Sequence, residues 1–189
     1  MENNHNVQNI QVDLSKYNSD FGLKNKIKRF IWQFCYIFLF RPFNLGIFRL
    51  WRIFTLKIFG ANLHWSSNVY ASSKIWAPWN LTMGAFSCIG PNVDCYNQGT
   101  IKIGTNTVIS QKTYLCASSH DYKQNSFPLI LKPIEIGNHV WVAADAFIGP
   151  GVIIADGTII GARSAVFKNT ESFSIYLGNP AFKIKDNVN

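Results

Sequence analysis

The chain has 189 residues, 48% of them hydrophobic, which allows one domain with a substantial core. Its four cysteines form no C-x-x-C pair and no small-scaffold spacing, so we interpret them as reduced thiols of a cytoplasmic protein rather than as a disulfide framework. The formal net charge of +8 is concentrated between Asp20 and Asp94, where nine Lys and Arg residues face no acidic residue. No recognised nucleic-acid-binding motif accompanies this charge, which argues against a nucleic-acid partner.

The N-terminal third is predicted to form an arm followed by a helical cap. Residues 1–20 are polar and Asn-rich, which indicates a loosely held arm without a secretory signal. Residues 23–59 mix basic and large apolar side chains, but the uninterrupted apolar character spans only about eleven residues, whereas a membrane-spanning helix needs roughly 20. Pro42 and Gly46 divide this stretch into two pieces, so residues 1–60 are assigned to an arm and a basic-aromatic cap of two helices.

Residues 136–170 repeat with a period of six. A branched aliphatic residue opens each of the six units, and Gly or Ala fills the second position in five of them. This period matches neither a helix nor a strand. It predicts a triangular solenoid of short parallel strands, in which the opening aliphatic residue points inward and the small fifth residue sits where two sides meet. Similar units begin at Ile103 and, more roughly, at Val69, so the solenoid is assigned to residues 61–172.

Three further segments interrupt or end this pattern. Residues 121–133 leave the ladder and end in Pro133, which predicts an extruded loop of the kind that often carries function. The polar segment around Asn97 is predicted to face a ligand cleft, with Asn97 as a substrate contact. An Asn at a solenoid corner can equally well satisfy local backbone groups. Residues 173–189 are expected to form a C-terminal tail.

Two roles are open for the cap. It can cover the exposed end of the solenoid, which every solenoid requires. Alternatively, part of its basic aromatic surface can lie on an anionic membrane and reach a lipid-linked substrate, as a peripheral protein at the inner face of that membrane. The two roles are compatible.

The repeat and several motifs resemble the hexapeptide-repeat acyltransferases, in particular the WcaF-like branch of sugar O-acetyltransferases in exopolysaccharide biosynthesis, relatives of the NodL, maltose and galactoside acetyltransferases. The residues that carry the resemblance are Asp13–Tyr17, Phe59–Ala61, Pro78–Leu81, Ser118–Asp121, Trp141–Gly151, Gly161–Ser164 and Gly178–Pro180. The resemblance implies an all-β fold, the left-handed parallel β-helix. Its handedness comes from the resemblance alone, because parallel crossovers are right-handed in most folds. It also implies acetyl-CoA as co-substrate, a sugar or glycan acceptor, and a homotrimer with active sites between subunits.

Acetyl transfer to a hydroxyl group needs a base, a polarised carbonyl and aligned substrates. His120 matches the catalytic base of the family in the Ser-Ser-His-Asp motif, so the resemblance implies that it is the general base of a direct transfer. Asp121 is expected to orient the imidazole or to bind the acceptor, although an Asp that merely starts the loop is an equal alternative. The other histidines are His5 in the arm, His64 before the first regular unit and His139, which is interpreted as a surface side chain.

The resemblance places cofactor contacts on Ala144, Ala162, Lys168 and Lys185. The two alanines are small enough for backbone to approach the pantetheine arm, and the lysines would meet phosphate as point charges. Ordinary solvated lysines are the alternative. Phe167 departs from the small polar residue that relatives often have there. Trp141 is expected to pack between subunits.

Other functions remain open on the same scaffold. An amino-sugar N-acetyltransferase uses the same base and differs only in the acceptor pocket. A γ-type carbonic anhydrase needs three histidines, but only His120 and His139 lie in the regular ladder, so no metal site is expected. A non-catalytic scaffold is disfavoured by the presence of His120. A covalent route with the Cys116 thiol as nucleophile is disfavoured. In the repeat register Cys116 occupies the small corner position, so its side chain points away from the sixth position of the unit, which is His120.

Overall fold

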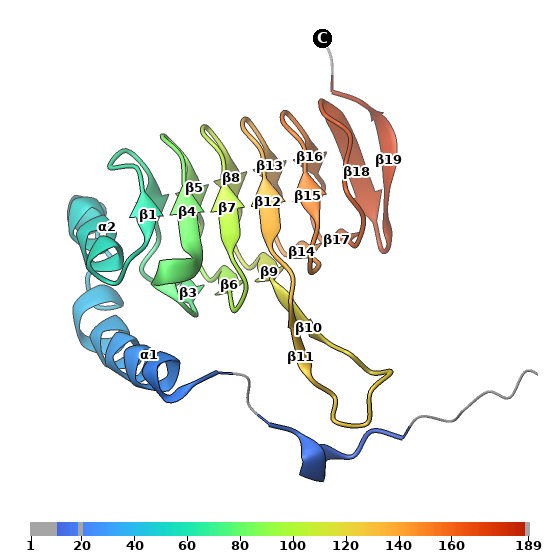
Figure 1. Cartoon of the computed structure of the whole chain (residues 1–189). Helices are drawn as coiled ribbons and strands as arrows, with labels where there is room; N and C mark the ends of the chain where they lie inside the picture. The colour runs from blue at the N-terminus through green and yellow to red at the C-terminus, as the bar shows by residue number, and fades with distance from the viewer. Residues whose placement is uncertain (1–10, 19–20, 188–189) are drawn as a thin grey trace, which may run out of the picture.

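The computed structural model describes residues 11–18 and 21–187 (Figure 1). Residues 1–10, 19–20 and 188–189 lie outside the described part, and with them His5 and the outermost ends of the predicted arm and tail. The described chain consists of a short N-terminal segment, a pair of helices, a solenoid and a C-terminal hairpin (Figure 1).

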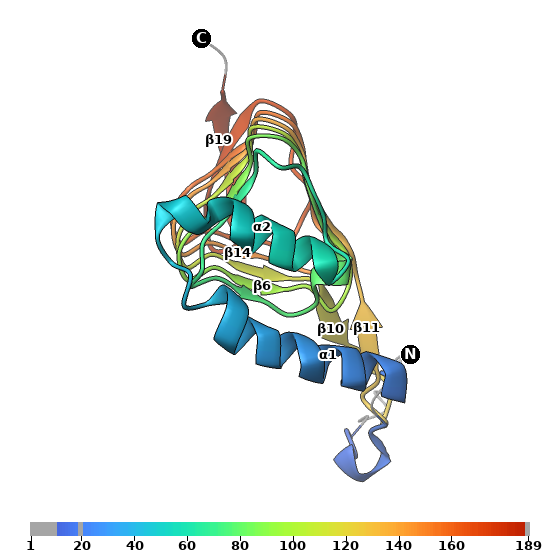
Figure 2. The ribbon, with the colours of Figure 1, turned by 90° about the vertical axis from the view of Figure 1, so that its left-hand side faces the viewer.

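Short parallel strands form the three faces of a triangular prism, and each turn of the chain adds one strand to each face (Figure 2). The first face contains β1 (Asn62–Leu63), β4 (Leu81–Met83), β7 (Ile101–Ile103), β12 (Ile134–Ile136) and β15 (Ile153–Ile154). The second contains β2 (Asn68–Val69), β5 (Cys88–Ile89), β8 (Val108–Ile109), β13 (Trp141–Val142), β16 (Ile159–Ile160), β18 (Ser174–Gly178) and β19 (Ala181–Asp186). The third contains β3 (Lys74–Ile75), β6 (Asp94–Tyr96), β9 (Tyr114–Cys116), β14 (Phe147–Ile148) and β17 (Ala165–Val166).

The six-residue period explains this architecture. The aliphatic residues that open the units are buried, and they stack in register on one another, as Val142 does on Ile160. The second position is small because the next coil lies close: a Cβ atom on Gly104 would lie 2.5 Å from the Gly137 carbonyl oxygen. The prediction of an all-β, left-handed parallel β-helix is confirmed.

Two helices lie across the N-terminal end of the prism (Figure 2). This cap consists of α1 (Leu23–Cys35), its π-helical continuation η2 (Tyr36–Phe40), the 3-10 turn η3 (Gly46–Phe48) and α2 (Arg49–Ile58). Its inner side chains, among them Trp32, Phe40, Ile53 and Leu56, are buried in the same core as the first coil. A further 3-10 turn, η4 (Pro78–Asn80), forms a corner of the first coil.

The cap also satisfies the free backbone edge of the solenoid. In later coils, the carbonyl of an opening aliphatic residue accepts from an N–H of the preceding coil, as Ile89 accepts from Tyr70 at 3.0 Å. The first coil has no preceding coil, so side chains of the cap donate instead. These bonds join Lys57 Nζ to the Leu63 oxygen (2.8 Å), Arg52 Nε to the Val69 oxygen (2.8 Å) and Trp32 Nε1 to the Ile75 oxygen (2.7 Å).

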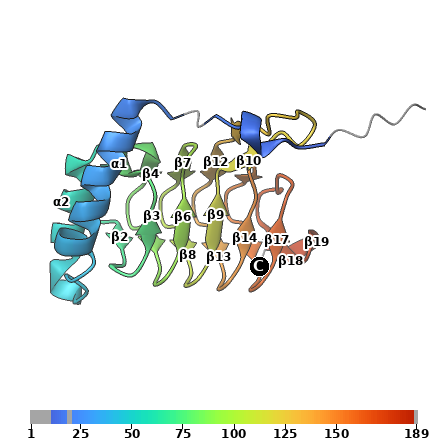
Figure 3. The same ribbon diagram turned by 90° about the horizontal axis from the view of Figure 1, so that it is seen from below.

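A β-hairpin projects from one corner of the prism (Figure 1, Figure 3). It consists of β10 (Ser118–His120) and β11 (Leu129–Leu131), paired antiparallel. The predicted extruded loop is confirmed, and the excursion starts slightly earlier, at Ser118. His120 therefore belongs to a strand of the hairpin rather than to the last position of a coil.

Residues 174–186 form two strands instead of the expected tail. β18 continues the second face parallel to β16, and β19 folds back antiparallel on β18. The structure therefore corrects the boundary at residue 173, because one more coil position is occupied. The repeat pattern missed this strand because its inward position holds the aromatic Tyr176, which is buried opposite Ile160, rather than a branched aliphatic residue.

Candidate active site

His120 lies at the corner where the third face passes to the first, between β9 and β12. The hairpin leaves the prism at this corner. Lys132 donates its backbone N–H to the Ala117 carbonyl at 3.0 Å and so closes the base of the hairpin. A Cβ atom on Gly99 would lie 2.6 Å from the same carbonyl oxygen, so glycine allows the preceding coil to pack beneath this base.

The imidazole of His120 is held by one residue of the hairpin. Its Nδ1 lies 2.9 Å from the carbonyl oxygen of Phe127, and the two rings stack with centroids 4.3 Å apart and planes at 3°. Because a carbonyl oxygen can only accept, Nδ1 carries the proton and Nε2 presents its lone pair. Among the described residues none bonds to Nε2. This arrangement suits a general base.

Phe127 adopts an unusual backbone conformation, with φ at 48°. Phe86 and Phe173, in turns of the solenoid, have the same left-handed conformation, so at Phe127 it marks a tight turn. Its N–H donates to the Gln124 carbonyl at 3.0 Å, which fixes the turn that aims its own carbonyl at His120. Sequence reasoning missed Phe127, because a contact made by a backbone carbonyl leaves no residue motif.

Asp121 does not contact the imidazole. Its carboxylate accepts from Lys123 N at 3.0 Å and from Gln124 Nε2 at 2.8 Å, while its own N–H donates to the Pro128 carbonyl at 3.0 Å. The structure therefore favours the alternative of an Asp that shapes the loop. Phe127 performs the orienting task that was one expectation for Asp121.

The N-terminal segment docks on the hairpin. Its 3-10 turn η1 (Leu14–Lys16) is capped by Asp13, whose carboxyl pKa is lowered by hydrogen bonds from Ser15 and by Lys16. Asp13 N donates to the Asn125 carbonyl at 2.8 Å, and the ring of Tyr17 lies 5.9 Å from that of His120. This part of the predicted loose arm is thus in contact with the site, as Figure 3 shows.

Asn97 has a structural role in place of the predicted substrate contact. Its side chain has no exposed surface. Its Oδ1 accepts from Ala77 N at 3.0 Å, and its Nδ2 donates to the Ala77 carbonyl at 2.6 Å. Both ends of the amide are used to join two consecutive coils, which is the alternative that a solenoid corner allowed.

The outer surface of the third face carries an aromatic ladder. Its rings belong to Trp76, Tyr96, Tyr114, Phe147 and Phe167, and successive centroids lie 6.3, 6.1, 5.6 and 5.6 Å apart. The Arg29 guanidinium lies 3.8 Å from the centroid of Trp76, and Phe21 packs on the same ring at 5.0 Å. Burial raises the pKa of Tyr114, so its phenol stays neutral at physiological pH.

A cavity of about 330 Å³ opens between the cap and the start of the aromatic ladder. Its lining residues are Gln33, Tyr36, Arg41, Lys74, Ile75, Trp76, Asp94 and Tyr96. Aromatic faces beside charged and amide groups suit a ring-shaped ligand rich in hydroxyls. Burial is the main cause of the raised pKa of Tyr96 in this cavity; Cys116 and Tyr17 add to the rise, and Arg29 opposes it.

The predicted cofactor contacts lie at different edges of the prism. Ala144 and Ala162 are stacked at the corner between the second and third faces, where Arg163 N donates to the Ala144 carbonyl at 2.9 Å. Lys168 is exposed and follows β17, at the edge of the third face from which the His120 hairpin also departs. Lys185 is exposed on β19. A single chain therefore does not gather these four residues around one ligand.

The remaining candidates have ordinary roles. The Cys116 thiol donates to the Ser118 carbonyl at 3.3 Å. His139 is exposed in a turn with φ at 55°, and His64 Nδ1 bonds to the Ser66 hydroxyl at 2.7 Å. In the ranges that the structure describes, no three His, Cys, Asp or Glu side chains gather as a metal site.

Comparisons with known proteins agree with this architecture. Residues 133–168 match the family described as "Bacterial transferase hexapeptide (six repeats)". WcaF of Escherichia coli (strain K12), assigned as a colanic acid biosynthesis acetyltransferase, is 40% identical over 178 residues, which cover 93% of this chain and 97% of WcaF.

Two solved structures share the fold. A hexapeptide-repeat acetyltransferase from Vibrio cholerae, complexed with acetyl coenzyme A, has a TM-score of 0.78 at 20% identity and covers 92% of this chain and 94% of its own. A galactoside acetyltransferase in complex with coenzyme A has a TM-score of 0.78 at 22% identity, with coverage of 90% and 86%. With the near full-length similarity to WcaF, the chain belongs to the hexapeptide-repeat acetyltransferases.

Proposed function

We propose that this protein is an acetyl-CoA-dependent O-acetyltransferase that acts on a sugar hydroxyl in surface-polysaccharide biosynthesis in the cytoplasm. The observation that carries the proposal is the hydrogen bond between His120 Nδ1 and the Phe127 carbonyl, which leaves Nε2 as a base. The similarity to WcaF supports the acetyl group and the polysaccharide pathway, and the acetyl-CoA and CoA complexes of the two structural neighbours support the donor.

In the proposed reaction, His120 Nε2 removes the proton of the acceptor hydroxyl while that oxygen attacks the thioester carbonyl carbon. A C–O bond forms and the carbonyl oxygen becomes an oxyanion, which backbone N–H groups of a neighbouring coil are proposed to stabilise. When the tetrahedral intermediate collapses, the C–S bond breaks and the proton on Nε2 passes to the leaving thiolate. The products are the acetylated sugar and CoA, and the base is regenerated.

The cavity beside Trp76 and Tyr96 is the proposed acceptor site. Its charged and amide groups can bond hydroxyls, and its aromatic rings can pack against the C–H face of a pyranose. Tyr96, which lines the cavity, and Tyr114 stack in successive coils of the third face, at whose corner the hairpin with His120 departs. Asp121 shapes the hairpin loop through its bonds to Lys123 N and Gln124 Nε2.

The donor is proposed to bind between subunits of a homotrimer. Ala144 and Ala162 occupy one edge of the third face, whereas His120 and Lys168 occupy the other edge. Placing the alanine edge of one subunit against the His120 edge of its neighbour would bring the predicted contacts to one groove. Lys185 would then reach the donor phosphates from the C-terminal hairpin. Trp141 is half exposed on the second face, which agrees with its proposed place in the interface.

The same base also serves an amino-sugar N-acetyltransferase, which is the second candidate. The cavity contains Asp94, whose carboxylate lies 3.5 Å from Lys74 and could receive a cationic amino group in its place. A non-catalytic scaffold is the third candidate. The hydrogen bond from His120 Nδ1 to the Phe127 carbonyl argues against it, because a scaffold has no use for an oriented imidazole.

The test is release of free thiol from acetyl-CoA by the purified protein with a panel of sugars and amino sugars. We expect turnover with a hydroxyl acceptor, and His120→Asn should lower it by about 10²–10⁴-fold. His139→Asn is the matched control, since asparagine tolerates the positive φ of that turn, and it should keep full activity. Full activity of His120→Asn would refute the mechanism.

Two further outcomes separate the candidates. Turnover confined to amino sugars would replace O-acetylation by N-acetylation. Absence of turnover together with absence of CoA binding in calorimetry would favour the scaffold. In the calorimetric experiment, Ala162→Leu should weaken CoA binding by tenfold or more, because its side chain would fill the edge along which the pantetheine arm is proposed to lie.

A further inference from the structure

The helices of the cap are apolar on the side that faces away from the prism. Along α1 and η2 the exposed side chains Ile27, Phe30, Ile31, Phe34, Ile37 and Phe38 recur at helical spacing. Along η3 and α2 the exposed side chains are Ile47, Leu50, Trp51, Phe54 and Ile58. We call these two rows the platform. A surface helix of a water-soluble protein normally turns its apolar stripe toward the core and its polar face outward. In this cap the inner faces of the helices are apolar as well, so the cap is apolar both toward the prism and toward the solvent.

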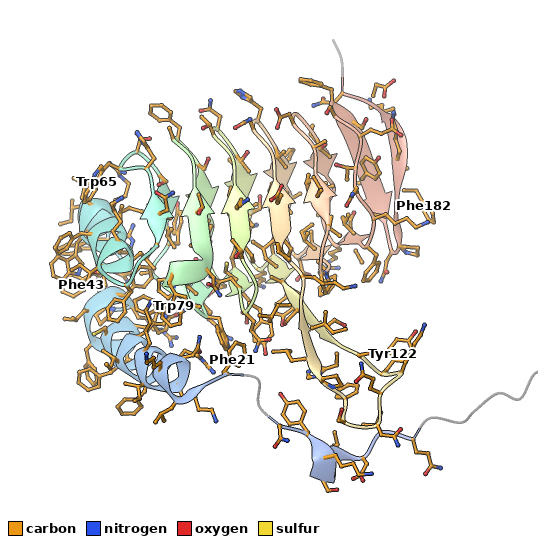
Figure 4. The ribbon with its side chains drawn as sticks, viewed as in Figure 1. Phe21, Phe43, Trp65, Trp79, Tyr122 and Phe182 are labelled. Atoms are coloured by element: carbon orange, nitrogen blue, oxygen red, sulfur yellow. The ribbon has the colours of Figure 1, made fainter. Side chains whose placement is uncertain are left out.

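The platform is broad and outward-facing. Phe30 is 75% exposed, Phe34 58% and Ile47 80%, values that leave most of each side chain in water. Both helices lie in the plane of the end face of the prism, and the solenoid lies on one side of them (Figure 1, Figure 2). Their side chains project outward as well as inward (Figure 4). A surface on which eleven exposed apolar side chains lie in two neighbouring rows marks an interaction site.

The charge around the platform has one sign. Lys24 and Lys26 are exposed, and within the described ranges neither forms an ion pair. Between Asp20 and Asp94 the sequence contains no acidic residue. On the solenoid, by contrast, the exposed Lys102 pairs with Glu135 at 3.0 Å.

We propose that the platform docks on the surface of an anionic lipid bilayer, with both helices lying in the interface. Aromatic and aliphatic side chains would enter the boundary between headgroups and acyl chains, and the flanking cations would meet anionic headgroups. A second copy of this chain is a poorer occupant, because face-to-face packing would bring the same unpaired cations together. None of the described helices is long and apolar enough to cross a membrane, so contact takes place at the surface of the bilayer. The docking does not depend on the proposed acetyl transfer.

The test is co-sedimentation of the full-length protein with sonicated vesicles. We expect binding to vesicles that contain phosphatidylglycerol and phosphatidylcholine, weaker binding to phosphatidylcholine alone, and a decrease with added salt. The triple variant Phe30→Ser, Phe34→Ser, Phe38→Ser should lower the binding constant by tenfold or more. The matched control Phe86→Ser, Phe182→Ser, Ile184→Ser removes three equally exposed apolar side chains elsewhere and should bind within about twofold of the wild type.

The cations are tested separately. Lys24→Gln with Lys26→Gln should weaken binding to the anionic vesicles by about tenfold or more, since each basic residue near such a surface contributes on the order of 1 kcal/mol. The control pair Lys112→Gln with Lys123→Gln, both exposed and distant in sequence from the platform, should leave binding unchanged.

Three outcomes would overturn the proposal. The first is wild-type protein that stays in solution with anionic vesicles, and the second is equal loss of binding in the platform variant and its control. The third is a platform variant that changes the oligomeric state in lipid-free buffer while the wild type ignores vesicles, which would make the platform an interface between copies. Circular dichroism checks the fold, and Phe30→Ser alone replaces the triple variant if that variant does not fold.

Discussion

The two ends of the solenoid are closed by different means. At the N-terminal end, donors on the side chains of Trp32, Arg52 and Lys57 satisfy the carbonyls of the first coil. At the C-terminal end, β18 extends the second face and β19 pairs with β18 through backbone hydrogen bonds (Figure 1). An unpaired strand edge is a liability that proteins cover. This chain covers the N-terminal edge with side-chain donors alone. At the C-terminal end a strand covers the second face, and side-chain oxygens of Asn169 and Thr170 accept from Ile153 N and Ala155 N of the first face at 2.9 Å.

The use of side-chain donors at the N-terminal end explains part of the concentration of basic residues in the N-terminal third of the chain. Backbone carbonyls at the first coil require donors, and Lys, Arg and Trp supply donors without acceptors. A side-chain cap of this kind makes each donor individually important, whereas a paired strand distributes the same task over several backbone groups. We therefore expect single substitutions to be costly at the inner side of the N-terminal cap and cheap at the C-terminal end. The comparison can be tested by urea denaturation at fixed protein concentration.

The largest effect is expected for Arg52→Leu. Arg52 is 3% exposed, and its guanidinium also donates to the carbonyls of Phe43 (2.7 Å) and Leu45 (3.0 Å). Its removal leaves the carbonyls of Phe43 and Val69 without a donor, while the Leu45 carbonyl keeps the Phe48 N–H, and we expect a loss of about 3 kcal/mol in the free energy of unfolding. A loss below about 1 kcal/mol would show that the first coil does not depend on this side chain.

A smaller loss is expected for Trp32→Phe. Phenylalanine keeps the contacts with Phe40 and Phe59 but cannot donate to the Ile75 carbonyl, so we expect about 1–2 kcal/mol. The matched control is Trp51→Phe, whose indole donates to the Leu39 carbonyl at 2.7 Å on the exposed side of the cap. Water can replace that donor, so equal losses in both variants would contradict our interpretation.

Lys57→Met and Lys183→Met compare one lysine at each end directly. Lys57 Nζ donates to the Leu63 carbonyl at the free edge, and its loss should cost about 1 kcal/mol. Lys183 forms ion pairs with Glu171 and Asp186, which raise its pKa, but these pairs lie on the solvent-exposed surface. We expect no measurable change in unfolding for Lys183→Met. A larger loss of stability for Lys183→Met than for Lys57→Met would contradict the proposed difference between the two ends.

The smallest effect is expected for Phe34→Ser on the platform. Phe34 is 58% exposed and touches Phe38 in the same row, so its loss should change the free energy of unfolding by no more than about 0.5 kcal/mol. A change in stability within this limit, combined with weaker vesicle binding, would show that the outer face of the cap serves binding and the inner face serves stability. A large loss of stability would instead place Phe34 in the core.

The amino-acid sequence alone was enough to predict the solenoid and to select His120 as the candidate general base. The period of six alone identifies which side chains point inward, because each unit repeats the same local geometry and buries the same position, as Ile136 and Ile154 do. Charge and hydrophobicity located the cap, and the motif around His120 selected the catalytic candidate. These features are local in the chain, so a linear pattern can carry them.

Only the tertiary structure decided how the site is assembled. Phe127 orients His120 through a backbone carbonyl, and Asn97 joins two coils through the backbone of Ala77, although its polar neighbours had suggested a ligand contact. Tyr17 reaches His120 from a distant part of the chain. Every residue has a backbone carbonyl, so its use as a partner leaves no trace in residue identity. The stacking of coils, which brings distant residues together, determines which carbonyls meet which side chains.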